Sequence, residues 1–246
     1  MKYSTQQQPT PGFTLMETLL AVALVGTLIS VFITVFVPVR GMIQQALTKQ
    51  DADRLVSTLR AEINTLHENE RSQPGAGSSP TSYSSPFDKG FYWLRTCRNP
   101  ATAIVIFSYR ADTSKPRRTD GTYPPIPINK AKPGADSLLT TVVCPMNDSV
   151  HRNDIQHSTG PVYVVKLTQL IPDSERYRLA NSPGTITGGS TPESYYSKDE
   201  KDPWGGALFC RADFYTMQHP NPARYKGRTW SRMGKPVFST NISFRR

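Results

Sequence analysis

The sequence predicts an α+β protein in which one long N-terminal helix packs on an antiparallel β-sheet, with long loops between the strands. Three observations carry this prediction. Residues 19–39 are 21 consecutive positions without a formal charge, helical periodicity continues beyond them, and five short β-like runs then follow between turn-rich segments. As a helix, residues 19–39 would span about 31 Å, which matches the hydrocarbon core of a bilayer.

One carboxylate, Glu17, stands near the start of this apolar segment. Left unpaired at a membrane edge it would cost a few kcal/mol, so it needs a partner or a function. A secretory signal peptide fits poorly, because its apolar core is shorter and ends in small residues at a cleavage site. Here the run ends in Pro38-Val39-Arg40. A plain signal anchor fits the length but explains neither Gly12-Phe13 nor Glu17.

The residues around Glu17 form a recognisable motif, Gly12-Phe13-Thr14-Leu15-Met16-Glu17-Thr18-Leu19-Leu20-Ala21. This pattern resembles the prepilin cleavage and methylation motif of type IV pilins and type II secretion pseudopilins. In that family a Gly precedes the cut, and Phe-Thr-Leu-x-Glu and an apolar run follow it. The resemblance covers only about the first 30 residues. It implies a pilin-like fold, a leader of residues 1–12 removed by a prepilin peptidase, and N-methylation at Phe13.

The resemblance also implies an assembly role for Glu17. In the family, the corresponding carboxylate pairs with the terminal ammonium of a neighbouring subunit, here the amine of Phe13. Opposite charges attract strongly in a low-dielectric environment, and each relieves the other's burial cost. The implied partners are other pilin or pseudopilin subunits, the peptidase, the inner-membrane assembly machinery and the membrane. The implied location is a single pass of the inner membrane with a cytoplasmic N-terminus and a periplasmic domain, and later a filament at the cell surface.

Helical periodicity continues through residues 40–71, the second half of the predicted helix. The apolar positions that share one face are Leu47, Leu55, Val56, Leu59, Ile63 and Leu66. We expect one helix from Phe13 to Asn69, with Pro38 or Gly41 as the place for any kink, in which residues 13–39 form the transmembrane or assembly half. The same residues also fit an anchor followed by an unrelated juxtamembrane helix.

The remaining chain predicts one β-rich globular domain at residues 87–246, after a flexible loop at residues 72–86 made mostly of small, uncharged residues. The predicted strands are Thr102–Tyr109, Leu138–Val143, Val162–Ile171, Ala207–Tyr215 and Val237–Phe244. Long connections at Asp112–Pro133 and Pro172–Asp202 are rich in Pro, Gly, Ser and charge. The sequence therefore predicts an antiparallel sheet of four to six strands.

A second, smaller motif lies at Asp202-Pro203-Trp204-Gly205-Gly206. It resembles the Asp-Pro-Trp-Gly element that precedes a strand in major pseudopilins, which also have a downstream calcium loop with spaced Asp residues. Here only Asp213 follows, and one carboxylate cannot organise a calcium site of six or more oxygens. We expect a turn whose Trp204 caps the core, and no metal.

Neither the histidines nor the glycines predict catalysis. The four histidines are scattered without zinc spacing, and we expect the loop that holds His151 and His157 to be solvated surface. No nucleophile elbow or phosphate-binding loop occurs. We predict a protein without enzymatic activity and without a cofactor.

Three cysteines, Cys97, Cys144 and Cys210, would lie in an oxidising compartment under this topology. One disulfide is compatible with that location and leaves one thiol over, but spacing does not select the pair. The alternative is that all three serve as small buried hydrophobes.

The chain is strongly basic, with a formal net charge of +10. Clusters lie at residues 110–118 and 130–132, and the C-terminal segment lacks acidic residues from residue 224 onward. The candidate cations of that segment are Arg224, Lys226, Arg228, Arg232 and Lys235. Because aromatic residues are interleaved, the pattern is compatible with binding of DNA or an anionic surface; it fits better a solvated face that keeps an exported domain soluble.

Together these patterns predict a structural subunit, of the minor kind, of a type IV pilus or type II secretion pseudopilus. One alternative is a DNA- or surface-binding module displayed on a pilin stalk. The other is a bitopic periplasmic domain that is never cleaved.

Overall fold

The computed structural model describes residues 14–71, 82–127, 137–173, 176–189 and 207–245, and within these it describes no side chains for residues 35–49 or 69. The expected leader at residues 1–12, Phe13, most of the loop at residues 72–86 and the Asp202–Gly206 motif lie outside the described residues. The chain divides into two compact units, Met1–Ala52 and Asp53–Arg246, and each is described by itself.

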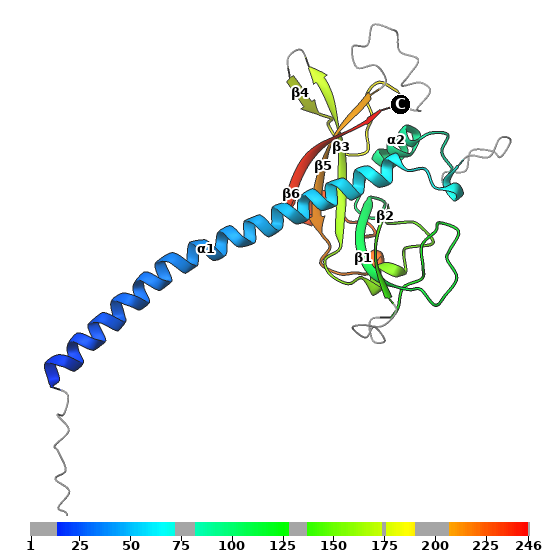
Figure 1. Ribbon diagram of the computed structural model, residues 1–246. Coiled ribbons are helices and arrows are strands. Elements are labelled where there is room, and N and C mark those ends of the chain that lie inside the picture. The colour runs from blue at the N-terminus through cyan, green and yellow to red at the C-terminus, as the bar shows by residue number, and fades with distance from the viewer. Residues whose placement is uncertain (1–13, 72–81, 128–136, 174–175, 190–206, 246) are drawn as a thin grey trace, which may run out of the picture. The chain divides into compact units, whose positions relative to one another are not determined.

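The first long element is the helix α1, Leu15–Asn64 (Figure 1). It is one continuous α-helix through Pro38 and Gly41. Its N-terminal unit contains Leu15–Thr34, a stretch whose mean hydropathy of 2.2 and length of 20 residues suffice to cross a membrane. The N-terminal apolar helix expected from the sequence is therefore present, but it ends five residues before Asn69. A single 3-10 turn, η1 (Glu68–Glu70), follows it.

The second unit is built on one curled antiparallel sheet. Its strands are β1 (Ile104–Asp112), β2 (Ser137–Pro145), β3 (Tyr163–Asp173), β4 (Arg176–Leu179), β5 (Ala207–Thr216) and β6 (Phe238–Arg245). The order across the sheet is β2-β1-β3-β5-β6, with β4 paired to the end of β3 (Figure 1). The α+β class and the antiparallel sheet predicted from the sequence are confirmed.

All five predicted strands are present, with ends that differ by no more than three residues. They were recognisable because their apolar runs are buried in the core: in β1, for example, Ile104, Val105 and Phe107 are almost fully buried. The short strand β4 was not predicted. It falls in the segment expected to be a loop, and its four residues are all exposed, so no burial pattern marks it.

A second helix, α2 (Pro86–Thr96), also went unpredicted. The hydroxyl of Ser85 accepts a hydrogen bond from the Asp88 amide, Pro86 occupies the first turn, and Asp88 adds a favourable charge there. Pro86 therefore begins a helix, whereas the sequence analysis assigned it to the end of a loop. Proline is typical of loops, but it is equally typical of the first turn of a helix.

The end of α1, α2 and the sheet share one core. Leu59 and Ile63 of α1 are almost fully buried, and Leu55, Val56 and Leu66 pack against the same cluster. The amphipathic face predicted for this part of the helix is thus confirmed. Gly90 of α2 permits the closest approach, because a Cβ there would lie 3.0 Å from Phe244 Cγ and 3.2 Å from Ile63 Cγ2. Phe244 belongs to β6, so three elements meet at this glycine.

Two irregular segments, residues 113–127 and 146–162, lie beside β1. β1 pairs with β3 only over Ile104–Ile106. Further along β1, single bridges join Tyr109 to Ser158 and Ala111 to Pro125, so both segments attach to that strand. The 3-10 helix η3 (Asp154–His157) lies in the second segment. This attachment brings charged side chains of the two segments together.

We predict that Gly90→Val destabilises the second unit by about 1–3 kcal/mol, because the added atoms must displace Phe244 or Ile63 in a closely packed core. Denaturant unfolding of the full chain in detergent, followed by tryptophan fluorescence, measures the loss. Gly26→Val is the control, since no heavy atom lies within 4 Å of the Cβ position there. Equal midpoints for Gly90→Val and the wild type would contradict the packing described.

Candidate functional site

The sequence-predicted assembly residue Glu17 lies in the first turn of α1 and is exposed. Its amide donates to the carbonyl and, at 3.3 Å, to the hydroxyl of Thr14, which therefore begins the helix as an N-terminal cap. Among the described residues the Glu17 carboxylate forms no ion pair. It is thus a negative charge at the start of an apolar helix, open to a partner from outside the described chain. Gly12 and Phe13, the predicted cleavage and methylation site, lie outside the described residues.

The helix surface around and beyond Glu17 is apolar and uncovered. Its large side chains from Leu15 to Ile33 are more than half exposed. The polar side chains between them are satisfied internally: the hydroxyls of Thr18, Thr27, Ser30 and Thr34 each donate to a backbone carbonyl three or four residues earlier. Such a surface suits hydrocarbon or the apolar side chains of other helices, because it offers no unpaired polar group there.

In the second unit, a fully buried ammonium joins the end of α1 to α2. Lys89 of α2 is 0% exposed, and its Nζ donates to Glu62 Oε1 at 2.8 Å and Glu70 Oε2 at 2.7 Å. The third donor reaches the carbonyl of Thr65 at 2.9 Å, where the last turn of α1 leaves carbonyls without helical partners. The same Nζ lies 4.8 Å from the centre of the Trp93 ring. All three protons of the ammonium are therefore used, as a buried charge requires.

The carboxylates around Lys89, together with His67, could at first sight hold a metal ion. Ligand atoms of Glu62, His67 and Glu70 lie within 4.8 Å of one another, and His67 Nε2 is 2.9 Å from Glu62 Oε1. The Lys89 ammonium, however, already contacts one oxygen of each carboxylate. It occupies the position that a cation would take, so this cluster is better described as an internal ion pair than as a metal centre.

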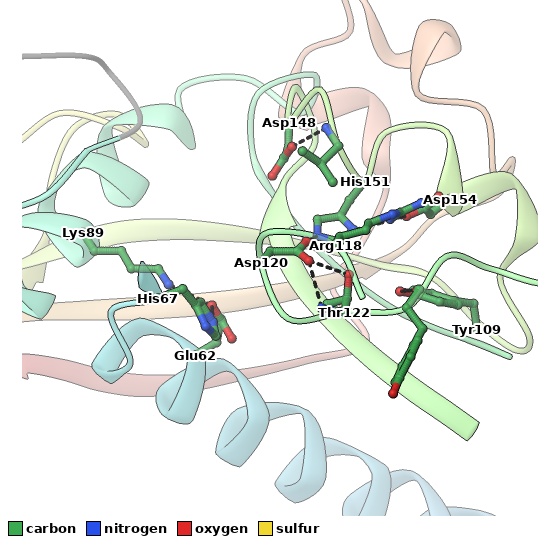
Figure 2. A network of polar contacts seen from close by, with 12 residues as sticks. Glu62, His67, Lys89, Tyr109, Arg118, Asp120, Thr122, Asp148, His151 and Asp154 are labelled. Atoms are coloured by element: carbon green, nitrogen blue, oxygen red, sulfur yellow. Dashed lines mark hydrogen bonds and ion pairs between the residues drawn. The ribbon is translucent and has the colours of Figure 1, made fainter. Parts of the chain in front are cut away.

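A second polar network joins the two irregular segments beside β1 (Figure 2). The imidazole of His151 lies between two carboxylates: Nε2 is 2.7 Å from Asp120 Oδ2, and Nδ1 is 3.2 Å from Asp154 Oδ2. Asp154 also accepts a forked pair of bonds from the Arg118 guanidinium, one of them at 3.1 Å. His151 was expected in solvated surface. This expectation is wrong, because the residue is 6% exposed and belongs to this network.

The electrostatics of this network follow from its geometry. Burial lowers the pKa of His151, but the hydrogen bond to Asp154 and the charges of Asp120, Asp148 and Asp154 outweigh it and raise the pKa above 6.5. Burial acts to raise the pKa of both carboxyl groups. Hydrogen bonds from Thr122 and the charge of His151 nevertheless lower the pKa of Asp120 below its usual range. Hydrogen bonds and charge from His151 and Arg118 likewise lower the pKa of Asp154.

A cavity of about 300 Å³ connects the two polar groups. Figure 2 shows Lys89, Glu62 and His67 in one group and His151 with Asp120 and Asp154 in the other. Its wall carries four carboxylates, those of Glu62, Glu70, Asp120 and Asp148, and the remaining lining includes Trp93 and residues 141–145 of β2. The cavity is thus an acidic hollow in an otherwise basic protein.

Comparison with protein-family models, with curated proteins and with solved structures found no match. Function is therefore argued from this chain alone.

Of the C-terminal cations, Arg224 lies on the 3-10 turn η4 (Pro222–Tyr225) and Arg232 on η5 (Trp230–Met233), whereas Lys226, Arg228 and Lys235 lie outside both turns. The exposed members are Arg224, Lys226, Arg232 and Lys235, while Arg228 is half-buried. Their aromatic neighbours are not surface platforms. Tyr225 and Phe244 are buried, Phe238 stacks on Phe214 at 4.2 Å between ring centres, and Trp230 packs on Tyr215. In the basic cluster at residues 110–118, Arg118 is bound to Asp154. Lys130 and Lys132, of the cluster at residues 130–132, lie outside the described residues.

The three cysteines are buried and unpaired, so the structure contains no disulfide among Cys97, Cys144 and Cys210. Burial raises the pKa of the Cys97 thiol to about 11 and also raises those of the other two, which keeps all three protonated. They act as small apolar side chains in the core. Asp213, the only carboxylate after the second motif, is occupied by Lys166 at 2.8 Å and by Arg211 and Ser239.

The Lys89 and His151 networks were missed at the sequence level. Lys89 lies within an amphipathic stretch that begins with a Pro, and nothing local marks it as buried. The partners of His151 are spread over 36 residues, from Arg118 to Asp154. A His three residues before an Asp is the one local signal, and it is common in loops.

We predict that Lys89→Met destabilises the second unit by about 3 kcal/mol, because Glu62 and Glu70 lose their only shared counter-charge in a mostly buried site. Replacing both carboxylates as well, in a triple variant with Glu62→Gln and Glu70→Gln, should recover a large part of that loss. Denaturant unfolding of the full chain in detergent provides the measurement.

The matched control for this prediction is Lys235→Met, which removes an exposed lysine and should leave the free energy of unfolding unchanged within about 0.5 kcal/mol. A Lys89→Met variant as stable as the control would show that the buried ion pair does not hold α1 to α2.

Proposed function

We propose that this chain is a structural subunit, of low abundance, of a type IV pilus or type II secretion pseudopilus. Its leader is removed after Gly12, Phe13 becomes the methylated N-terminus, and the subunit passes from the inner membrane into a filament. The observation that carries the proposal is an exposed Glu17, without an ion-pair partner among the described residues, in the first turn of an apolar helix of membrane length that follows the Gly12-Phe13 pair.

The apolar surface of α1 supports assembly in which contacts with neighbouring helices replace contacts with lipid. In the membrane, lipid covers the exposed apolar side chains of α1; in a filament, the same side chains would pack against neighbouring helices. Glu17 gains most from the second state, because a terminal ammonium of a neighbouring subunit would neutralise it in a low-dielectric environment. The carboxylate therefore favours a subunit partner over lipid alone.

The second unit supports a role in which the domain is displayed rather than catalytic. Its buried Lys89 and His151 are paired with carboxylates of other segments and serve to join elements. At 27.4 kDa the chain is large for the repeating subunit of a filament, which favours a minor component.

The alternative of a DNA- or surface-binding module on a pilin stalk rests on the exposed cations of residues 224–235. These can still contact phosphate groups, but the buried aromatic rings are not available for stacking on bases. Any DNA binding would then be electrostatic, and its affinity would fall steeply with salt. The other alternative, an uncleaved bitopic domain, leaves Gly12-Phe13 and Glu17 without a role.

We predict that Glu17→Ala leaves leader removal intact but reduces incorporation into filaments by at least about tenfold, because the apolar helix then has no charge with which to select the neighbouring Phe13 ammonium. Immunoblots of membrane and sheared-filament fractions from the native host measure both quantities. Gly12→Leu should instead block leader removal, since a side chain at the cut obstructs the peptidase.

Asp53→Ala is the matched control, because it removes an exposed carboxylate further along the same helix. It should be processed and incorporated like the wild type. Glu17→Ala subunits at wild-type levels in the filament fraction would contradict the proposed role of Glu17.

A further inference from the structure

The contacts of His151 require both ring nitrogens to carry a proton. Nδ1 faces Asp154 Oδ2 at 3.2 Å and Nε2 faces Asp120 Oδ2 at 2.7 Å. A neutral imidazole has one N–H, and its other nitrogen is an acceptor. In the neutral form, one of these contacts would oppose the lone pair of a nitrogen to that of a carboxylate oxygen. Only the imidazolium places a positive charge between the two carboxylates and opposes no nitrogen lone pair to either.

Asp154 and Asp120 differ in the charged partners that remain to them when His151 loses a proton. Asp154 retains the Arg118 guanidinium, which is bound to both of its oxygens. Asp120 has no second cation within ion-pair distance among the described residues. Its Oδ1 accepts from the amide and hydroxyl of Thr122 at 2.9 and 2.8 Å, whereas its Oδ2 is buried and accepts no hydrogen bond of good geometry there. That oxygen depends on the charge of His151.

We propose that His151 is a pH-sensitive clamp that, when doubly protonated, fastens the turn at residues 118–122 to the segment at residues 146–162 and, on losing a proton, releases Asp120 while it keeps Asp154. The neutral ring retains its Nδ1–H for Asp154. The bare Nε2 then faces a buried carboxylate oxygen with no counter-charge, which is costly enough to move Asp120 toward water, while the Arg118–Asp154 ion pair still holds the start of the turn.

The turn that holds Asp120 is compact and small. Arg118 N donates to Thr122 O at 2.8 Å, Gly121 N donates to Arg118 O at 2.9 Å, and Gly121 has φ +81°, which a residue without Cβ adopts freely. Asp120, Gly121 and Thr122 also line the acidic cavity of about 300 Å³. Movement of this turn therefore changes access to that cavity, in a domain that the proposed function places outside the cytoplasm. The clamp itself does not depend on that location.

The direction of the pH dependence follows from all the charged groups that face His151: Asp120 on the turn, and Asp148 and Asp154 on its own segment, with Arg118 bound to Asp154. Because they raise the pKa of His151 above 6.5, the stabilisation is fully present below about pH 6.5 and is lost as the pH rises through the higher folded-state value. The pKa values of both carboxyl groups are lowered, so they stay charged throughout this range.

The test is hydrogen–deuterium exchange of the full chain in detergent at about pH 6 and about pH 9, corrected for the intrinsic exchange rate. We expect the protection of amides 118–122 to fall by about threefold to tenfold in the wild type as the pH rises. Asp120→Asn should abolish this change, because the neutral amide has no ion pair to lose. His157→Gln, a histidine in the same segment outside the network, should retain the wild-type profile.

Nitrogen chemical shifts of the wild-type His151 ring provide an independent measurement that needs no variant. Both nitrogens should be protonated at about pH 6, and the two shifts should move together at a pH above 6.5. A ring with one bare nitrogen at about pH 6 would overturn the proposal. So would an Asp120→Asn variant in which the protection of amides 118–122 keeps the wild-type pH dependence.

Discussion

The buried ammonium of Lys89 is the interaction on which the architecture of the second unit depends. It binds Glu62 near the end of α1, Glu70 just beyond it and the carbonyl of Thr65, the residue after α1, and it does so from near the start of α2. Each partner alone would leave a charge or a carbonyl unsatisfied away from water. Together they fix where the long helix stops and how its last turns pack on the globular domain. The packing of Leu59 and Ile63 beside Gly90 then follows from that junction.

The two halves of the chain use charge in opposite ways. In the second unit, buried charges are neutralised internally, by Lys89 in one network and by His151 with Arg118 in the other. In the first unit, Glu17 is left without a partner among the described residues and sits at the start of an apolar helix. We propose that this carboxylate at the helix start is an assembly contact. This contrast underlies the proposal of a filament subunit.

The elements predicted from sequence were those with a strong local signal. The apolar helix, the amphipathic stripe at residues 55–66 and five strands all bury or expose continuous faces, so their periodicity is readable. α2 was missed because Pro86 was interpreted as the end of a loop, although Ser85 before it is a good cap. β4 was missed because all its residues are exposed. The His151 network could not be predicted, because Arg118 and Asp120 reach His151 only after the sheet brings two distant segments to β1.

The most direct test of the central claim is the intact mass of the protein purified from its native membranes, together with sequencing of its N-terminal peptide. We expect a chain that begins at Phe13, carries one methyl group on its amine and lacks residues 1–12. A chain that still begins at Met1, or one cut elsewhere in residues 13–39, would contradict it. In either case Glu17 would have no neighbouring Phe13 ammonium to bind, and the proposal that α1 is an assembly element would be wrong.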